Sequence, residues 1–292
     1  MIVDPVAVAV SEPYIPPRTG SERARTALVY AILIAISLLF FVPFVWSVST
    51  SFKTLPQTAF FNLLPHPWSF KGYHDALTKF NFARYMANSA GLAAVITLSN
   101  LFLAALGGYA FARLRFPGRE VLFMLVLGTL MIPDQLRLVP VFIMETNWHL
   151  VGHYQGYYVI KAVEAANLFF MRQYFLTIPK DFEEAAKLDG AGYFKTFWKV
   201  MLPLAGPALA AVTILEFQGI WNDFFWPFIV LGFGNPSNYT LTMGIVQFVF
   251  QYQTDWPPLM AASVIAVLPI ALLFVFFQRY FVAGVVASGV KG

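Results

Sequence analysis

The chain has 292 residues, of which 59% are hydrophobic and only 12% are charged. Soluble domains carry about 25% charged residues, so this composition indicates a protein embedded in a bilayer. The absence of cysteine excludes disulfides, thiolate metal sites and cysteine nucleophiles, while the formal net charge of +4 is modest. His149 and His153 have i, i+4 spacing, but Gly152 and Gly156 beside them indicate a loop, so we expect no metal site.

Residues 1–26 have the composition of a flexible tail rather than a cleavable signal. They contain acidic residues and a run interrupted by prolines, Pro13 to Pro17. The uncharged run that follows, 26–52, is too long for a signal-peptide core and long enough to cross a membrane. We therefore divide the chain into an amino-terminal tail, 1–26, and a membrane domain, 27–292.

Six apolar segments are long enough to be membrane spans. Three are uncharged and exceed the roughly 20 residues that cross a hydrocarbon core, and three are interrupted by charges. The uncharged segments are 26–52, 85–112 and 256–278; the interrupted ones are 121–144, 154–171 and 207–231. The sequence thus predicts an all-α polytopic membrane protein with six transmembrane helices.

The distribution of basic residues predicts which side of the membrane each loop occupies. Six spans place thirteen basic residues on one face, namely Arg18, Arg23, Arg25, Arg113, Arg115, Arg119, Arg172, Lys180, Lys187, Lys195, Lys199, Arg279 and Lys291. The opposite face keeps Lys53, Lys71, Lys79 and Arg84. By the positive-inside rule, we expect both termini, and thus the amino-terminal tail, to be cytoplasmic. Omitting the span 154–171 would move the lysine-rich loop outside.

The charged loop at about 178–207 differs from its apolar flanks. Asp181 and Glu184 have the spacing of a capping box, and Gly190 fits a helix stop. A second helical pattern begins near Ala191, and Pro203 marks the entry to the next span. This pattern predicts two short helices on the cytoplasmic surface. These helices could lie in the membrane interface as amphipathic helices. Alternatively, they form a docking element, because their small residues permit another backbone to approach closely.

Several motifs identify this chain as similar to a known family. Glu184-Ala185-Ala186 followed by Asp189-Gly190-Ala191, Phe194, Phe197 and Leu202-Pro203 resembles the EAA loop of ABC importer permeases. Trp221-Asn222-Asp223-Phe224 with Trp226-Pro227, and the Lys291-Gly292 end, resemble the maltose-type carbohydrate-uptake group. The resemblance covers roughly 27–292 and implies a type I ABC importer permease fold.

The resemblance implies that the loop is a coupling helix that docks into a separate ATPase. The residues carried over to that role are Glu183, Glu184, Ala185, Ala186, Asp189, Gly190, Ala191, Phe194 and Pro203. ATP and Mg would bind only at the ATPase subunits. Consistent with this, the run from Gly190 to Thr196 lacks the glycine directly before lysine that a Walker loop needs.

The family also implies a set of partners and a mechanism of alternating access. The partners are a second permease, two ATPase subunits, an extracytoplasmic solute-binding protein, membrane lipid and a sugar, and we expect no nucleic acid. This chain would itself bind no cofactor and would not be an enzyme. The solute class that the resemblance implies is a di- or oligosaccharide, with glycerol phosphate or another polyol as the alternative within the family. It also implies a location in the prokaryotic inner membrane.

Polar residues inside the spans are candidates for the solute pathway. Buried charges in a membrane are costly and usually face the bundle interior or water. The candidates are Glu216, Trp221, Asn222, Asp223, Trp226 and Gln135. A helix–helix packing role is equally compatible with Asn222 and Asp223, and the role of Glu216 stays open between solute contact and packing.

Two further charge pairs have i, i+3 spacing within apolar segments. For Asp134 with Arg137 we expect a simple ion pair. For Lys161 with Glu164 we expect a location near the outer end of a span, where long side chains reach water. An ion-coupled secondary transporter or channel, which also places charges within spans, is the rival functional class.

Overall fold

A computed structural model describes residues 20–249 and 253–289. It divides into two compact units, 1–46 and 47–292, and each is considered by itself. The first 19 residues of the predicted tail, including Arg18, and the Lys291-Gly292 end lie outside the described residues. Helix α1, Gly20–Ser51, begins six residues before the predicted span, so residues 20–26 are helical rather than part of a tail.

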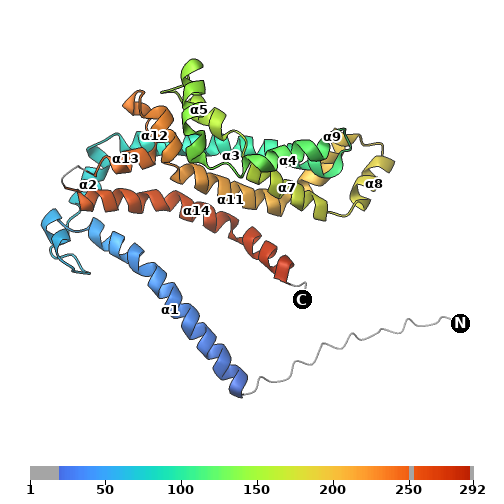
Figure 1. The fold of residues 1–292 in the computed structure, drawn as a ribbon. Coiled ribbons are helices and arrows are strands. Elements are labelled where there is room, and N and C mark those ends of the chain that lie inside the picture. Colours follow the sequence, from blue (N-terminus) through green and yellow to red (C-terminus); the bar gives the residue numbers. More distant parts are fainter. Residues whose placement is uncertain (1–19, 250–252, 290–292) are drawn as a thin grey trace. The chain divides into compact units, whose positions relative to one another are not determined.

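The described residues form helices and no β-strand (Figure 1). After α1 the longer elements are α2 (Lys71–Thr78), α3 (Phe82–Arg113), α4 (Arg119–Thr129), α5 (Asp134–Asn147), α6 (Tyr154–Lys161), α7 (Ala165–Thr177), α8 (Asp181–Leu188), α11 (Gly206–Asn222), α12 (Phe225–Leu231), α13 (Leu241–Val246) and α14 (Trp256–Gly289). Short helical turns are η1 (Leu55–Ala59), α9 (Tyr193–Thr196), η2 (Phe197–Met201), α10 (Leu202–Leu204) and η3 (Pro236–Asn238).

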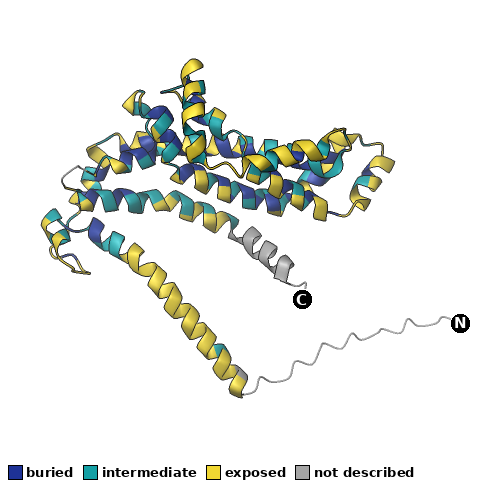
Figure 2. Cartoon of the chain, viewed as in Figure 1, coloured by how far each residue is buried: buried dark blue, intermediate teal, exposed yellow. Residues whose placement is uncertain are grey.

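Three of the described helices are long and apolar enough to cross a membrane. They contain Arg23–Ser51, Phe82–Arg113 and Trp256–Phe277, and they match the three uncharged runs. The part of α1 in the first unit is exposed along its length, as lipid contact requires (Figure 2). The all-α prediction is confirmed for the described residues.

The interrupted apolar segments are broken helices. Helices α4 and α5, over the predicted span 121–144, bend by 100°, and Tyr193–Leu204, in the predicted loop 178–207, bends by 75° from α11. Counting each of these pairs as one span raises the total to five. The predicted span 207–231 is itself interrupted between α11 and α12. Pro133 precedes α5 and disfavours helical geometry in the residue before it, which explains the first break. The segment 154–171 is likewise two helices, α6 and α7, so the six-span count stays a prediction.

The core of the second unit is built around α3, which packs along α7 and α11 (Figure 1). Small residues make this packing close. A Cβ on Gly108 would lie 2.8 Å from the backbone nitrogen of Arg172, so only glycine lets α3 and α7 approach at this point. Ala104 and Ala105 are also buried in this contact, together with Met171 and Phe175 of α7.

Ion pairs tie α2 to the chain just before α14. Lys79 Nζ lies 3.0 Å from Asp75 and 2.8 Å from Asp255. The hydrogen bond to Asp255 raises the pKa of Lys79 above its ordinary 10.5. Burial acts to raise the pKa of Asp75, but the hydrogen bond and charge of Lys79 outweigh it, so this pKa lies below its ordinary 3.8.

Candidate functional site

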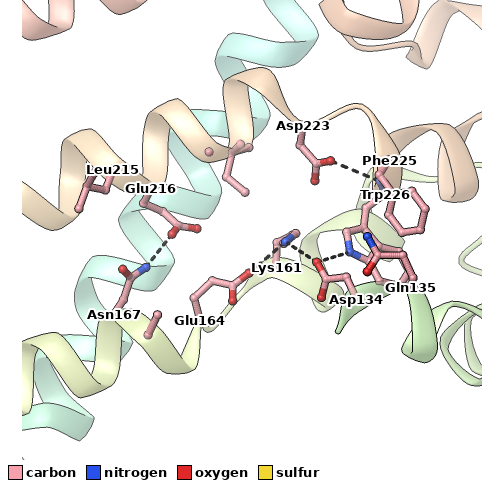
Figure 3. Close-up of a pocket in the computed structure, with 13 residues that line it drawn as sticks. Asp134, Gln135, Lys161, Glu164, Asn167, Leu215, Glu216, Asp223, Phe225 and Trp226 are labelled. Carbon is pink, nitrogen blue, oxygen red and sulfur yellow. Dashed lines mark hydrogen bonds and ion pairs between the residues drawn. The ribbon is translucent and has the colours of Figure 1, made fainter. Parts of the chain in front are cut away.

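A polar pocket lies where three helix breaks meet. Its volume is about 490 Å³. It is bounded by the start of α5, the break between α6 and α7, and the end of α11 (Figure 3). The lining residues are Asp134, Gln135, Lys161, Glu164, Ala166, Asn167, Leu215, Glu216, Gly219, Ile220, Asp223, Phe225 and Trp226. Carboxylates and amides from separate helices therefore face one cavity inside an apolar bundle.

Asn100 of α3 holds the α6–α7 break in place. This fully buried side chain donates to the carbonyl of Lys161 at 2.6 Å and accepts from the backbone N–H of Glu164 at 2.6 Å. The amide of Asn100 thus bonds the carbonyl and the N–H that a continuous helix would have bonded internally. Asn100 also donates to Glu216 Oε1 at 3.0 Å, and Asn167 donates to Glu216 Oε2 at 2.6 Å. Glu216 therefore has a packing role as well as a position on the pocket wall.

A second network crosses the pocket from α5 to α12. Lys161 Nζ lies 3.1 Å from Glu164 Oε1 and 3.9 Å from Asp134 Oδ2. The indole N–H of Trp226 donates to Asp134 Oδ2 at 3.2 Å. Asp223 accepts from the hydroxyl of Tyr157 at 3.0 Å and from the backbone N–H of Trp226 at 3.4 Å, which links the end of α11 to the start of α12.

The structure brings four of the six predicted pathway residues to this pocket: Gln135, Glu216, Asp223 and Trp226. Trp221 is elsewhere, stacked on Phe217, with its indole N–H donating to the carbonyl of Ala266 in α14 at 3.0 Å. Asn222 is exposed and does not line the pocket. Because α11 turns about 100° per residue, consecutive residues at its end face different directions.

The predicted pairs have different surroundings in the structure. Asp134 and Arg137 form the expected ion pair. Lys161 pairs with Glu164, but its side chain is only 14% exposed and faces the pocket, which corrects the expectation of a lysine reaching water at the end of a span. Sequence reasoning missed Asn100 and Asn167. The charges of Lys161 and Glu164 within an apolar segment were the sequence feature that could have indicated a polar site at the α6–α7 break.

The second candidate region is the loop that contains α8 and α9. Helix α8 begins at Asp181, with Lys180 as N-cap and no capping bond from a side chain, which corrects the predicted capping box. Asp181 is instead in the first helical turn, where an acidic residue interacts favourably with the helix dipole. The predicted stop is present: Gly190 follows the helix end and has φ +76°, a left-handed conformation that favours glycine.

The α8–α9 loop exposes large apolar side chains. Leu188 is 89% exposed, and Phe182, Tyr193 and Phe194 are also exposed. Among the predicted coupling residues Glu184, Ala185, Asp189, Gly190 and Pro203 are exposed, Ala191 is half-buried and Ala186 is buried. This combination leaves an apolar and small-residue surface available to another protein.

Glu183 faces inward, toward the end of α3. Its carboxylate lies 3.5 Å from Arg113, and the two side chains are 13% and 5% exposed. Arg113 also donates to the carbonyl of Phe175 at 2.5 Å and to the carbonyl of Ile178. The end of α3, the end of α7 and the first turn of α8 are thereby joined through one guanidinium.

Comparisons with known proteins agree with this architecture. Residues 101–286 match the family model for the binding-protein-dependent transport system inner membrane component. The chain is 39% identical over 208 residues to an arabinooligosaccharides transport system permease protein, AraQ, of Halalkalibacterium halodurans, covering 71% of this chain and 74% of that protein. It is 34% identical over 276 residues to a diacetylchitobiose uptake system permease protein, NgcG, of Streptomyces coelicolor, covering 92% and 90%.

A solved structure is similar over nearly the whole chain. It is a bacterial ABC transporter involved in the import of the acidic polysaccharide alginate, which matches with a TM-score of 0.80 and 25% identity over 91% of this chain and 100% of that one. The sequence resemblance, the family match and the shared fold agree. The chain belongs to the family of binding-protein-dependent transport system inner membrane components, the permease subunits of ABC importers.

Proposed function

We propose that this chain is one of two permease subunits of an ATP-driven importer for a di- or oligosaccharide. The observation that carries the proposal is the α8–α9 loop, whose exposed apolar surface is joined to α3 and α7 through Arg113. A short helix anchored in this way can transmit movement of a docked ATPase to the spans as a rigid body. The polar pocket then serves as part of the solute pathway.

The proposal includes the topology and partners that the family implies. Six spans over 27–292 place both termini and the loop at about 178–207 on the cytoplasmic side. A second permease completes the pathway, two ATPase subunits hold ATP and Mg, and a solute-binding protein delivers the sugar from outside. The relatives' names support the carbohydrate assignment, because they include arabinooligosaccharide and diacetylchitobiose systems.

Docking can be tested with one exposed leucine on the loop and one elsewhere. In Leu188→Asp a charge is placed at the centre of the proposed contact, on a residue whose burial is not needed for folding. The matched control is Leu64→Asp, since Leu64 is 72% exposed in the loop between α1 and α2. We expect Leu188→Asp to lose capture of the ATPase subunit and ATP-driven uptake in proteoliposomes, with normal membrane insertion, and Leu64→Asp to keep ATPase capture.

Two results would overturn the proposal. The first is full ATPase capture and uptake by the Leu188→Asp complex. The second is solute accumulation driven by an ion gradient without ATP, which would favour a secondary transporter.

The predicted topology can be tested by labelling one residue of the loop. Because the chain lacks cysteine, a single Lys187→Cys substitution gives one labelling site. An impermeant maleimide should label it only in inside-out vesicles.

A further inference from the structure

We propose that the pocket accepts uncharged or amine-bearing sugars and rejects anionic ones. This inference rests on the proposed function, because it requires that solute passes the pocket. The pocket holds four acidic residues, Asp134, Glu164, Glu216 and Asp223, and one basic residue, Lys161. Its charge is therefore opposite to what an anionic solute would need.

The pocket and its nearest cation have no net positive charge in either of two protonation states. Arg137 pairs with Asp134 beside the pocket and adds one positive charge. With all carboxylates ionised, the group carries two more negative than positive charges. If the two most enclosed acids, Glu216 and Asp223, are both protonated, the group is neutral. In neither case does the cavity present a net positive charge.

Apart from the amide of Gln135, the positive and donor side chains that line the pocket already have acidic partners. Lys161 is held between Glu164 and Asp134, and the indole N–H of Trp226 is bonded to Asp134. The amide of Asn167 donates to Glu216. A carboxylate or phosphate that reached a remaining N–H of Lys161 would share this one ammonium with Glu164 and Asp134 and would face the acids of the pocket at short range.

Acceptor capacity is what remains available to a solute. An ionised carboxylate offers about four lone-pair positions, and Glu164 uses one of them for Lys161. Hydroxyl and ammonium groups can donate to the positions that remain, while Gln135 adds an amide without charge. The apolar wall is formed by Phe225, Leu215 and Ile220. Trp226 is almost fully buried and contributes its N–H rather than an open ring face.

The test uses one oligosaccharide in three forms on the complete transporter with its own partners. An arabinotriose or maltotriose is used as the neutral sugar, as the aldonic acid oxidised at the reducing end, and as the amine made there by reductive amination. The affinity of the isolated binding protein for each form is measured first. Initial ATP-driven uptake into proteoliposomes is then compared with the binding protein saturated, so that the comparison reports the permease.

Two variants separate charge from structural damage because they break the same ion pair. Glu164→Gln removes a negative charge and Lys161→Gln removes a positive charge. We expect the wild-type complex to transport the acid at least tenfold more slowly than the neutral sugar. The acid-to-neutral ratio should rise in Glu164→Gln and fall in Lys161→Gln, each by at least about threefold for one unit charge at roughly 6 Å in water.

The outcomes distinguish failure of this inference from failure of the proposed function. Equal transport of the acid and neutral forms by the wild type, or movement of the ratio in the same direction in both variants, would overturn the charge selection while leaving the importer intact. If none of the neutral sugars is transported in an ATP-dependent manner, the proposed carbohydrate function itself fails.

Discussion

Replacing Arg113 with methionine tests whether α8 is anchored to the spans as the contacts indicate. The substitution keeps a long apolar side chain but removes the group that joins Glu183, the carbonyl of Phe175 and the carbonyl of Ile178. Glu183 would then be a largely buried carboxylate without its cation. Breaking such a pair costs about 3–5 kcal/mol, and the lost hydrogen bond to the carbonyl of Ile178 adds about 1–3 kcal/mol. The carbonyl of Phe175 keeps its hydrogen bond from the backbone N–H of Ile178.

The structure predicts how large the local effect should be. The lower figure, about 3 kcal/mol, corresponds to roughly a hundredfold shift of an opening equilibrium. Amide hydrogen exchange of α8, measured by mass spectrometry on the assembled complex, should therefore accelerate by about two orders of magnitude. Glu183→Gln leaves Arg113 bonded to both carbonyls and should accelerate exchange by about tenfold or less.

Glu184→Gln is the matched control, because it makes the same chemical change one residue along the same helix on an exposed side chain. Because Glu184 also belongs to the proposed coupling surface, both glutamate variants are compared after the ATPase subunits have been removed, and there the exchange rates of Glu184→Gln should equal those of the wild type. ATP-driven uptake should fall in Arg113→Met, since a loosened α8 cannot move the spans with the ATPase. Unchanged exchange in Arg113→Met, or equal acceleration in both glutamate variants, would show that the Arg113–Glu183 contact does not anchor the helix.

Two further predictions follow from local geometry. Gly190→Ala must adopt φ +76° with a Cβ, at a cost of about 1–2 kcal/mol, and should reduce ATP-driven uptake, whereas Gly190→Asn should keep most of it because asparagine tolerates this conformation. The lowered pKa of Asp75 adds stability that is present above pH 3.8 and lost as pH falls through its folded-state value, and the raised pKa of Lys79 adds stability present below pH 10.5 and lost at higher pH. A spin label on α2 should accordingly keep constant mobility between pH 3.8 and pH 10.5 and become more mobile outside this range. Lys79→Met removes about 1 kcal/mol of partly exposed ion pairing, so the label in this variant should be more mobile at every pH. A wild-type label whose mobility changes steadily across neutral pH would contradict this assignment.

Local chemistry was enough to predict the apolar helices and the end of α8. The uncharged runs at 26–52, 85–112 and 256–278 are long enough to cross lipid as helices, and a helix satisfies its backbone hydrogen bonds within one segment. The stop at Gly190 likewise depends on one residue's freedom to adopt positive φ. These properties need no knowledge of distant residues.

The interrupted segments show where sequence reasoning ended. A charge in an apolar run indicates a polar environment but does not indicate whether the helix continues past it. The α6–α7 break is stabilised by Asn100, more than sixty residues earlier in the chain, and Glu183 is held by Arg113 from another helix. Neither partner can be read from spacing along the chain.

The sequence by itself determined the family, the helical class, the three uncharged spans and the position of the α8–α9 loop, because all of these follow from composition, periodicity and local motifs. Only the tertiary structure decided that Lys161 and Glu164 share a cavity with Glu216 and Asp223 while Trp221 packs against α14. The reason is geometric: the direction of each side chain depends on where its helix bends and on which neighbour satisfies the backbone at the bend.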